Sequence, residues 1–199
     1  MGRRKTYERD DLIAKAMECF RDRGFGGTST AVLVEELGVN RNSLYSEFGS
    51  KQALFDACLE RYDAGAISRN FGPLEAPDAG LKQVRQVVEF FASAAAAPAM
   101  GRGCLLCNTA VEFGPEDPSG HDFVANYLAR LSGSFLNALS NAKRDGTLRA
   151  TASVDDEAQF LTATVLGIFV MLRAAADPAM IRGATNVAIR HIRAISKAD

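Results

Sequence analysis

Residues 28–51 read TSTAVLVEELGVNRNSLYSEFGSK, and this stretch decides the fold. Its first half places Val32, Leu33 and Leu37 at the spacing of one apolar helix face. Gly38 follows at the point where a glycine in the left-handed conformation commonly ends a helix, because glycine carries no Cβ. We therefore expect a short helix that stops at a tight turn.

A second short helix follows the turn. Asn40 is a favoured N-cap residue, and Leu44 and Phe48 lie four residues apart on one apolar face. The residues left on the other face are Arg41, Asn42, Ser43, Tyr45 and Ser46. Short hydrogen-bonding side chains, with one cation and one aromatic ring, suit phosphates and base edges. The pair predicts a helix-turn-helix whose second helix reads DNA.

Helical patterns also flank this stretch. Apolar residues at helical spacing predict further helices over 8–23, 50–69, 81–97, 104–113, 119–144, 155–176 and 179–195. Glycine and proline at 72–80 predict a linker between two regions. We expect an all-α chain of about nine helices. Residues 1–50 would be an N-terminal arm and a three-helix DNA-binding domain, 51–70 a connecting helix, and 71–199 a domain for ligand binding and dimerisation.

The charge balance is nearly neutral. The 199 residues carry a formal net charge of −1, with nine Lys/Arg and eight Asp/Glu in residues 1–51. An almost neutral protein can still bind DNA through a local cluster of cations, such as Arg3, Arg4, Lys5 and Arg9. The charge balance permits DNA binding and does not by itself establish it.

The sequence also suggests a compartment. It has no uncharged apolar run of about 18 residues, and its start, MGRRKTYERDD, lacks the apolar core of a signal peptide. The four cysteines are expected to be reduced. We therefore expect a cytoplasmic protein without a membrane span.

The penultimate helix is apolar around much of its circumference, as LTATVLGIFVML at 161–172 shows. One monomer covers a single stripe of a helix, so the surplus needs another surface. Pairing of the last two helices with their copies in a second subunit would bury it and would place two reading helices about 34 Å apart. The alternative is a central helix that is fully buried within one chain.

With the helices assigned, the N-terminal third resembles the tetracycline-repressor (TetR) family of transcriptional regulators. The resemblance rests on Phe20, Gly24-Phe25, Thr28-Ser29, Leu33-Val34, Leu37-Gly38-Val39, Ser43-Leu44-Tyr45, Phe48-Gly49-Ser50-Lys51 and Leu54-Phe55. The segment Gly103-Cys104-Leu105-Leu106, with Asn108, Ala110 and Glu112, is similar to a sixth-helix pattern in one branch of that family. The family implies a dimeric, all-helical repressor that a small effector releases from a double-stranded DNA operator.

The resemblance also implies roles for individual residues. Thr28, Ser29, Tyr45 and Lys51 would contact phosphates or the DNA backbone, Arg41, Asn42 and Ser43 would contact base edges, and Thr30 and Ser46 complete the expected DNA-binding set. Glu47 departs from the family pattern, which commonly has a neutral side chain there. Because a carboxylate repels phosphate, we expect Glu47 to turn away from DNA or to restrain non-specific binding.

An effector cavity is expected in the C-terminal domain. The candidate lining residues are Phe91, Asn108, Glu112, Phe113, Phe123, Tyr127 and Phe169, which would give apolar walls with a few polar groups for a largely apolar effector. Aromatic residues at helical spacing are equally well explained as core. The sequence alone leaves both interpretations open.

Cys104 and Cys107 lie three apart on one face of an expected helix. They could form a thiol sensor for oxidants or electrophiles, because Arg102 and the helix N-terminus would lower a thiol pKa. They are explained as well by burial as small apolar side chains. A zinc site with His121 lacks a fourth ligand at standard spacing, so no metal is expected.

Enzymes form the contrasting class of function. The sequence contains no phosphate-binding loop, dinucleotide fingerprint, Gly-x-Ser-x-Gly elbow or metalloprotease helix, so neither catalysis nor a cofactor is expected. A helical enzyme or a small-ligand carrier remains the remote alternative to a regulator. A gel shift with the promoter region of its own gene would separate these classes.

Overall fold

The computed structural model describes residues 7–94, 101–113 and 121–197. Its elements are α1 (Arg9–Arg23), α2 (Thr30–Leu37), α3 (Arg41–Phe48), α4 (Lys51–Tyr62), the π-helix η1 (Asp63–Ile67), α5 (Ser68–Glu75), α6 (Leu81–Ala94), α7 (Leu105–Glu112), α8 (His121–Arg144), α9 (Val154–Arg173) and α10 (Pro178–Ile195). Since α4, η1 and α5 follow one another without a break, these ranges hold nine helical rods. The predicted all-α class is confirmed.

Some sequence expectations fall outside those ranges. They concern the basic residues Arg3, Arg4 and Lys5, most of the alanine run at 94–97, and the expected helix cap Ser119. The side chain of His121 also lies outside the described residues.

Helices α2, α3 and α4 form at the expected places because their starts are encoded locally. Ser29, Asn40 and Ser50 each accept a hydrogen bond from the backbone N–H three residues later. Gly38 ends α2 in the left-handed conformation. Phe20 and Phe55, whose ring centroids lie 4.8 Å apart, join α1 to α4 in the core of this end of the molecule.

The expected linker at 72–80 begins later than predicted. The helix continues through Gly72 and Pro73 to Glu75, although proline cannot donate the backbone hydrogen bond of a helix interior. Phe71 and Leu74 are fully buried on this segment, and Arg130 of α8 donates to both oxygens of Glu75 at 2.7 and 3.0 Å. Burial and this bidentate ion pair outweigh the tendency of Gly72 and Pro73 to break the helix.

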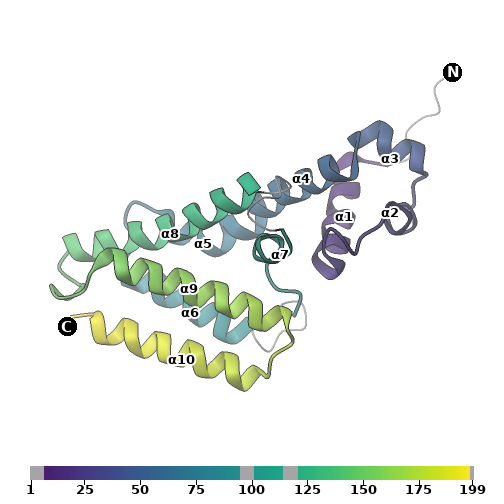
Figure 1. Ribbon diagram of the computed structural model, residues 1–199. Helices are drawn as coiled ribbons and strands as arrows, with labels where there is room; N and C mark the ends of the chain where they lie inside the picture. The colour runs from purple at the N-terminus through teal and green to yellow at the C-terminus, as the bar shows by residue number, and fades with distance from the viewer. Residues whose placement is uncertain (1–6, 95–100, 114–120, 198–199) are drawn as a thin grey trace.

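The helices pack into an elongated molecule with two ends (Figure 1). The unit α1–α3 lies at one end, around the start of α4, and we call it the reading unit. The rest is a bundle in which α8 packs on α9 and α10 packs on α6, while α7 contacts α1, α4, α8 and α9. Phe91 is at the centre of the bundle, with ring centroids 5.9 Å from Phe71 and 5.0 Å from Phe169.

Part of the apolar surface of α9 and α10 is uncovered. Phe160 and Val170 on α9, and Met180 and Val187 on α10, are between 41% and 61% exposed. The penultimate helix therefore buries one side in the chain's own core and leaves apolar side chains on another. A helix that is fully buried within one chain, the alternative to dimerisation, is not what the structure shows.

Candidate nucleic-acid interface

Helix α3 turns its polar side outward because two apolar residues fix its other side. Leu44 is 3% exposed and Phe48 is 8% exposed, and both belong to the core. On the opposite side Arg41, Asn42 and Ser46 are exposed, while Ser43 and Tyr45 are half-buried. The structure thus brings the five expected α3 candidates onto one outward surface.

A contact between α2 and α3 orients the aromatic ring of this surface. The hydroxyl of Tyr45 lies 3.1 Å from the hydroxyl of Thr30, and the guanidinium of Arg41 lies 5.6 Å from the centre of the Tyr45 ring. The hydrogen bond with Thr30, followed by that with Arg41, lowers the pKa of Tyr45. Thr30, Arg41 and Tyr45 form one connected group across the turn.

Ser29 and Lys51 lie at the edge of the same surface with part of their donor capacity in use. The Ser29 hydroxyl oxygen accepts from the backbone N–H of Val32 at 3.3 Å, which leaves its O–H free to donate. The Lys51 ammonium donates to the carbonyl of Phe25 at 2.7 Å and lies 4.0 Å from the centre of that ring. Two N–H donors of Lys51 remain for a phosphate.

Thr28 does not belong to the surface, which corrects the sequence expectation. Its side chain is fully buried, and its hydroxyl lies 2.6 Å from the carbonyl of Gly24 and 3.4 Å from that of Cys19. The hydroxyl therefore holds the end of α1 to the start of the next segment. It is not available to a phosphate.

Glu47 is turned away from solvent, in line with the first of the two expectations for it. The side chain is 9% exposed, and its carboxylate lies 3.9 Å from the guanidinium of Arg9 on α1. The same guanidinium lies 5.2 Å from the centre of the Phe48 ring. The negative charge of α3 thus faces α1, on the side away from Arg41 and Asn42.

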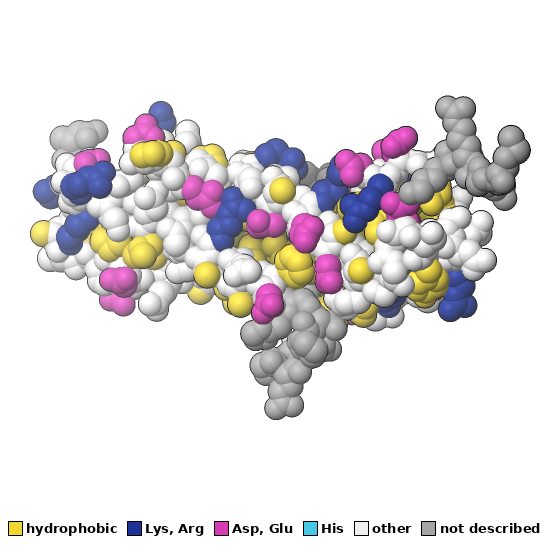
Figure 2. All heavy atoms as spheres, turned by 90° about the horizontal axis from the view of Figure 1, so that it is seen from above, with side chains coloured by type: hydrophobic (Ala, Val, Ile, Leu, Met, Phe, Trp, Pro, Cys, Tyr) yellow, Lys and Arg dark blue, Asp and Glu magenta, His cyan; other side chains and the backbone are white. Residues whose placement is uncertain are grey.

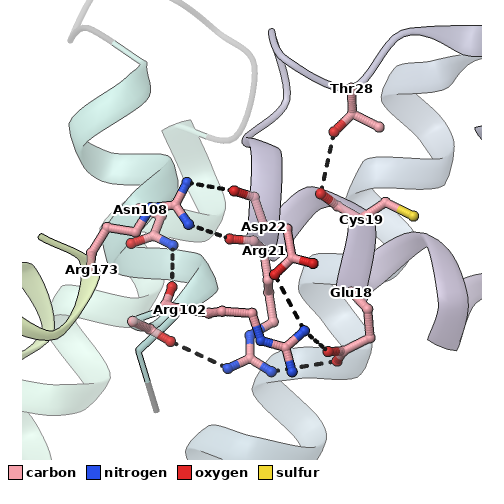
Figure 3. A network of polar contacts seen from close by, with 9 residues as sticks. Glu18, Cys19, Arg21, Asp22, Thr28, Arg102, Asn108 and Arg173 are labelled. Carbon is pink, nitrogen blue, oxygen red and sulfur yellow. Dashed lines mark hydrogen bonds and ion pairs between the residues drawn. The ribbon is translucent and has the colours of Figure 1, made fainter. Parts of the chain in front are cut away.

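The reading unit is tied to the bundle by polar contacts at the end of α1, and we call this region the joint (Figure 3). Arg173, in the last turn of α9, donates to the carbonyls of Arg21 at 2.8 Å and Asp22 at 3.0 Å. Arg102 lies 2.5 Å from a carboxylate oxygen of Glu18 and 3.3 Å from one of Asp22. The C-terminal end of a helix carries a partial negative charge, so these two guanidinium groups are stabilised at the end of α1.

Glu112 makes a second set of contacts in the joint. From the end of α7 its two oxygens accept from the backbone N–H groups of Phe25, at 2.9 Å, and Gly26, at 2.6 Å. Gly24 precedes these donors with φ 73°, and a Cβ placed on it would lie 2.7 Å from a Glu112 oxygen. Two consecutive backbone N–H groups of the reading unit thus bind one carboxylate of the bundle.

The joint is not predicted from the sequence. Arg173 and Arg102 carry no local motif, and their partners on α1 lie about 150 and 80 residues away in the sequence, respectively. Asn108 and Glu112 were expected to contact an effector. Instead the Asn108 amide donates to the carbonyl of Arg102 at 3.0 Å, and Glu112 binds the reading unit.

The described cavities do not bring the seven expected effector-lining residues together. Phe91 and Phe169 are core residues, and the Phe113 ring packs 5.5 Å from that of Phe25 at the joint. Asn108 and Glu112 line a cavity of about 270 Å³ together with Arg23, Gly24, Cys107, Val111, Val170 and Arg173. Phe123 and Tyr127 line a different cavity of about 280 Å³ with Glu60, Asp63, Leu106, Asn126 and Arg130. Among the described cavities these residues are divided between two sites, so a single effector pocket stays a prediction.

The environment of Cys104 and Cys107 opposes a thiolate. Both are buried, and burial raises the pKa of Cys104 and raises that of Cys107 from 9.0 to about 11. Arg102 was expected to lower these values, but its guanidinium faces Glu18 and Asp22. Since the thiolate is the reactive form, Cys107 is a poor nucleophile at neutral pH, although it lines the cavity at the joint.

Two further sequence expectations concern metals and membranes. Within the described residues no three His, Cys, Asp or Glu side chains gather closely enough to hold a metal ion, and the His121 side chain is outside that set. Across the same residues, no helix combines the length and the apolar character that a membrane span requires.

Comparison with known proteins agrees with this geometry. Residues 12–58 match the bacterial regulatory proteins of the tetR family, and residues 80–188 match the tetracyclin repressor-like C-terminal domain. The uncharacterized HTH-type transcriptional regulator YezE of Bacillus subtilis (strain 168) is 28% identical over 178 residues, 89% of this chain and 92% of that protein. The HTH-type transcriptional repressor ComR of Escherichia coli (strain K12) is 26% identical over 88% of this chain and 84% of its own length.

A solved structure extends the likeness to the whole fold. A cysteine mutant of the TetR family transcriptional regulator CifR, complexed with 26 bp double-strand operator DNA, superposes with a TM-score of 0.83. It is 24% identical, and the alignment covers 94% of this chain and 98% of that one. The matched family is one of regulators and not of enzymes. This chain belongs to the tetR family of bacterial regulatory proteins.

Proposed function

We propose that this protein is a transcriptional repressor that binds double-stranded operator DNA as a homodimer and leaves it when a small effector binds the bundle. The observation that carries the proposal is the outward polar side of α3, held in place by Leu44 and Phe48. Relatives named as HTH-type transcriptional repressors, and the structure of CifR with operator DNA, support the same function.

Base reading is assigned to the start of α3. In a helix-turn-helix the N-terminal residues of the second helix reach the base edges in the major groove. Arg41, Asn42 and Ser43 occupy that position and would contact base edges. Ser29, Thr30, Tyr45, Ser46 and Lys51 surround them, with hydroxyl, phenol and ammonium donors that would contact the backbone phosphates.

The homodimer is proposed from the uncovered apolar side chains of α9 and α10. Phe160, Val170, Met180 and Val187 come from the two helices that lie next to each other in the bundle. An isologous pairing of these helices with their copies would bury all four side chains in each of the two subunits. Light scattering should give twice the chain mass, and Val187→Asp should shift it toward the monomer, whereas Arg182→Asp, an exposed control on α10, should not.

The joint is proposed to transmit the effector signal. It connects the reading unit to both α7 and α9, through Glu112 and Arg173. Because α9 would also form the dimer interface, a movement of α7 or α9 would change the angle between the two reading units. Binding of an effector that favours such an arrangement would shift the population away from the half-site spacing of the operator.

The cavity between α4, α7 and α8 is proposed as the effector site. It contains Phe123 and Tyr127, two of the expected lining residues, and adjoins the π-helix η1, a wide turn of the kind often found at functional sites. The polar groups of this cavity indicate a less apolar effector than the sequence suggests. Arg130 is already bonded to Asp63 and Glu75, whereas Glu60 has no ion pair among the described residues. An effector with an apolar body and one cationic or hydrogen-bond-donating group fits better than a wholly apolar one.

Footprinting on the DNA upstream of its own gene tests the function directly. We expect protection of a palindromic site and its loss in Asn42→Ala, while Arg69→Ala, which removes an exposed cation on α5, should bind as the parent does. If no segment upstream is protected, and a pool of random duplexes selected for binding yields no consensus, the protein is not a sequence-specific repressor.

A further inference from the structure

A second concave surface lies at the opposite end of the molecule from α3 (Figure 1). It is a groove of about 470 Å³ between the start of α6, the turn at Gly146 and Thr147, and the end of α10. We call it the distal groove. It shares no residue with the reading surface, the joint or the proposed effector cavity.

Cations from two separate helices converge on the distal groove. Lys82 and Arg85 come from the first turns of α6, Arg193 from the last turn of α10, and Lys197 from just beyond it. No Asp or Glu is among the described residues that line it. Arg85 has Glu89 as an ion-pair partner at 3.4 Å, whereas the other three have none within the described part of the chain.

The unpaired cations of the distal groove contrast with several arginines that lie between carboxylates elsewhere in the protein. Arg102 at the joint and Arg130 on α8 each face two carboxylates. On the face shown in Figure 2, Lys and Arg side chains lie among Asp and Glu side chains along most of the length of the molecule. Four cations nevertheless line one groove in a chain whose formal net charge is −1.

The backbone holds the groove in a fixed shape. Leu148 and Ser196 form an antiparallel bridge, the N–H of Lys197 donates to the carbonyl of Thr147 at 2.8 Å, and the N–H of Arg149 donates to that of Ile195 at 2.8 Å. These bonds keep the end of α10 beside the turn that follows α8. Because α6 packs on α10, the cations of the two helices line the same groove.

We infer that the distal groove binds a small multivalent anion, one that carries two or more phosphate or carboxylate groups. Like charges held around a concave surface raise the local positive potential, and an anion between them removes the repulsion. Lys and Arg supply only donors, which phosphate and carboxylate oxygens accept in charge-assisted hydrogen bonds. The volume is in the range of small-molecule sites, about 300–1,000 Å³.

Isothermal titration of the full-length protein with tripolyphosphate, and separately with citrate, tests the site. We expect one anion per chain at a constant ionic strength of about 0.15 M. Arg193→Ala and Lys82→Ala should each weaken binding on the order of tenfold, since each removes a charge-assisted contact. Arg193→Lys should retain most of the affinity. The matched control is Arg190→Ala, which removes an exposed α10 cation outside the groove.

Three results would overturn the inference. The first is equal weakening by Arg190→Ala, and the second is binding of several anions per chain, either of which would indicate a diffuse charge effect. The third is displacement of tripolyphosphate by a non-operator duplex, which would make the surface a nucleic-acid contact. A preference for tripolyphosphate or for citrate identifies the phosphate or the carboxylate source. Operator binding measured on the same variants should be unchanged without the anion, which separates this inference from the proposed function.

Discussion

The reading surface and the joint are built from similar side chains and differ in where their hydrogen-bonding capacity goes. On the reading surface Arg41 and Asn42 point outward, and Ser29 and Lys51 keep donors to spare. At the joint the guanidinium of Arg173 donates to two carbonyls of α1, and Glu112 accepts two backbone N–H groups. Unused donors mark a surface for an external partner, whereas satisfied groups mark a connection within the chain.

The difference predicts separable effects of substitution. Changes on the outward side of α3 should alter DNA binding and leave the fold and the effector response intact. Changes at the joint should leave DNA contacts in place and alter how binding depends on the effector. Changes to the core beneath α3 should affect the fold, DNA binding and the effector response together. The outward surface forms only while Leu44 and Phe48 anchor α3 in the core.

Leu44→Ala should have the largest effect. The side chain is 3% exposed beneath α3, and removing a buried leucine to alanine costs about 2–5 kcal/mol of the free energy of unfolding. Urea denaturation followed by circular dichroism measures the loss. Ser46→Ala, on the exposed side of the same helix, is the control and should unfold as the parent does. Equal stability of the two variants would mean that Leu44 does not hold α3.

Arg41→Ala comes next, with an effect on binding and little on stability. If Arg41 contacts a base edge, its loss should reduce discrimination at one operator base pair by about 1–3 kcal/mol. Tyr45→Ala should instead weaken binding to all operator variants alike, since a phosphate contact carries no sequence information. Competition binding with single-base operator variants separates the two. Uniform weakening by Arg41→Ala would move this residue to the phosphate contacts.

The reading surface could be predicted from the sequence to a greater extent than the joint. The end of α2 and the start of α3 were predicted because Gly38 and Asn40 act within three residues of their own position. The outward side of α3 followed from the spacing of Leu44 and Phe48. For such elements the determining contacts are local, so a single sequence contains them.

Contacts between distant segments could not be obtained in this way. Thr28 sits in a polar cluster that looks like a cap, and only the packing of α1 against the next segment shows that its hydroxyl is buried. Gly72 and Pro73 signal a break, which the burial of Phe71 and Leu74 overrides. Glu112 has the polarity expected of an effector contact, and its real partners lie more than 80 residues earlier.

Glu112→Ala should weaken the link between effector and operator. Because the carboxylate is exposed, we expect less than about 1 kcal/mol of change in the free energy of unfolding. Allosteric coupling is typically about 1–3 kcal/mol, so losing one of its contacts should reduce the effector-dependent ratio of operator affinities several-fold. Fluorescence anisotropy with labelled operator, with and without effector, measures this ratio.

Two matched variants give this test its controls. Glu112→Gln keeps one carbonyl oxygen, which can still accept from an N–H of the 25–26 segment. It should therefore reduce the effector-dependent ratio of affinities less than Glu112→Ala does. Asp155→Ala removes an exposed carboxylate at the start of α9, away from the joint, and should respond to the effector as the parent does. A full effector response in Glu112→Ala would show that the signal reaches the reading unit by another route, with Arg173 the next candidate.

Thr28→Val and Ser29→Ala form the finest test, because the two residues are adjacent and each loses one hydroxyl. Thr28→Val should cost about 1 kcal/mol of stability, since it leaves the Gly24 carbonyl without its buried donor, and should not change operator affinity per folded molecule. Ser29→Ala should cost a similar amount through loss of the α2 cap, and should also weaken operator binding by about 2–10-fold if the outward O–H donates to a phosphate. Urea denaturation and anisotropy on the same samples separate the two quantities. If Thr28→Val weakens binding as much as Ser29→Ala, the buried hydroxyl takes part in DNA recognition after all, and the boundary drawn here between outward and internal groups is in the wrong place.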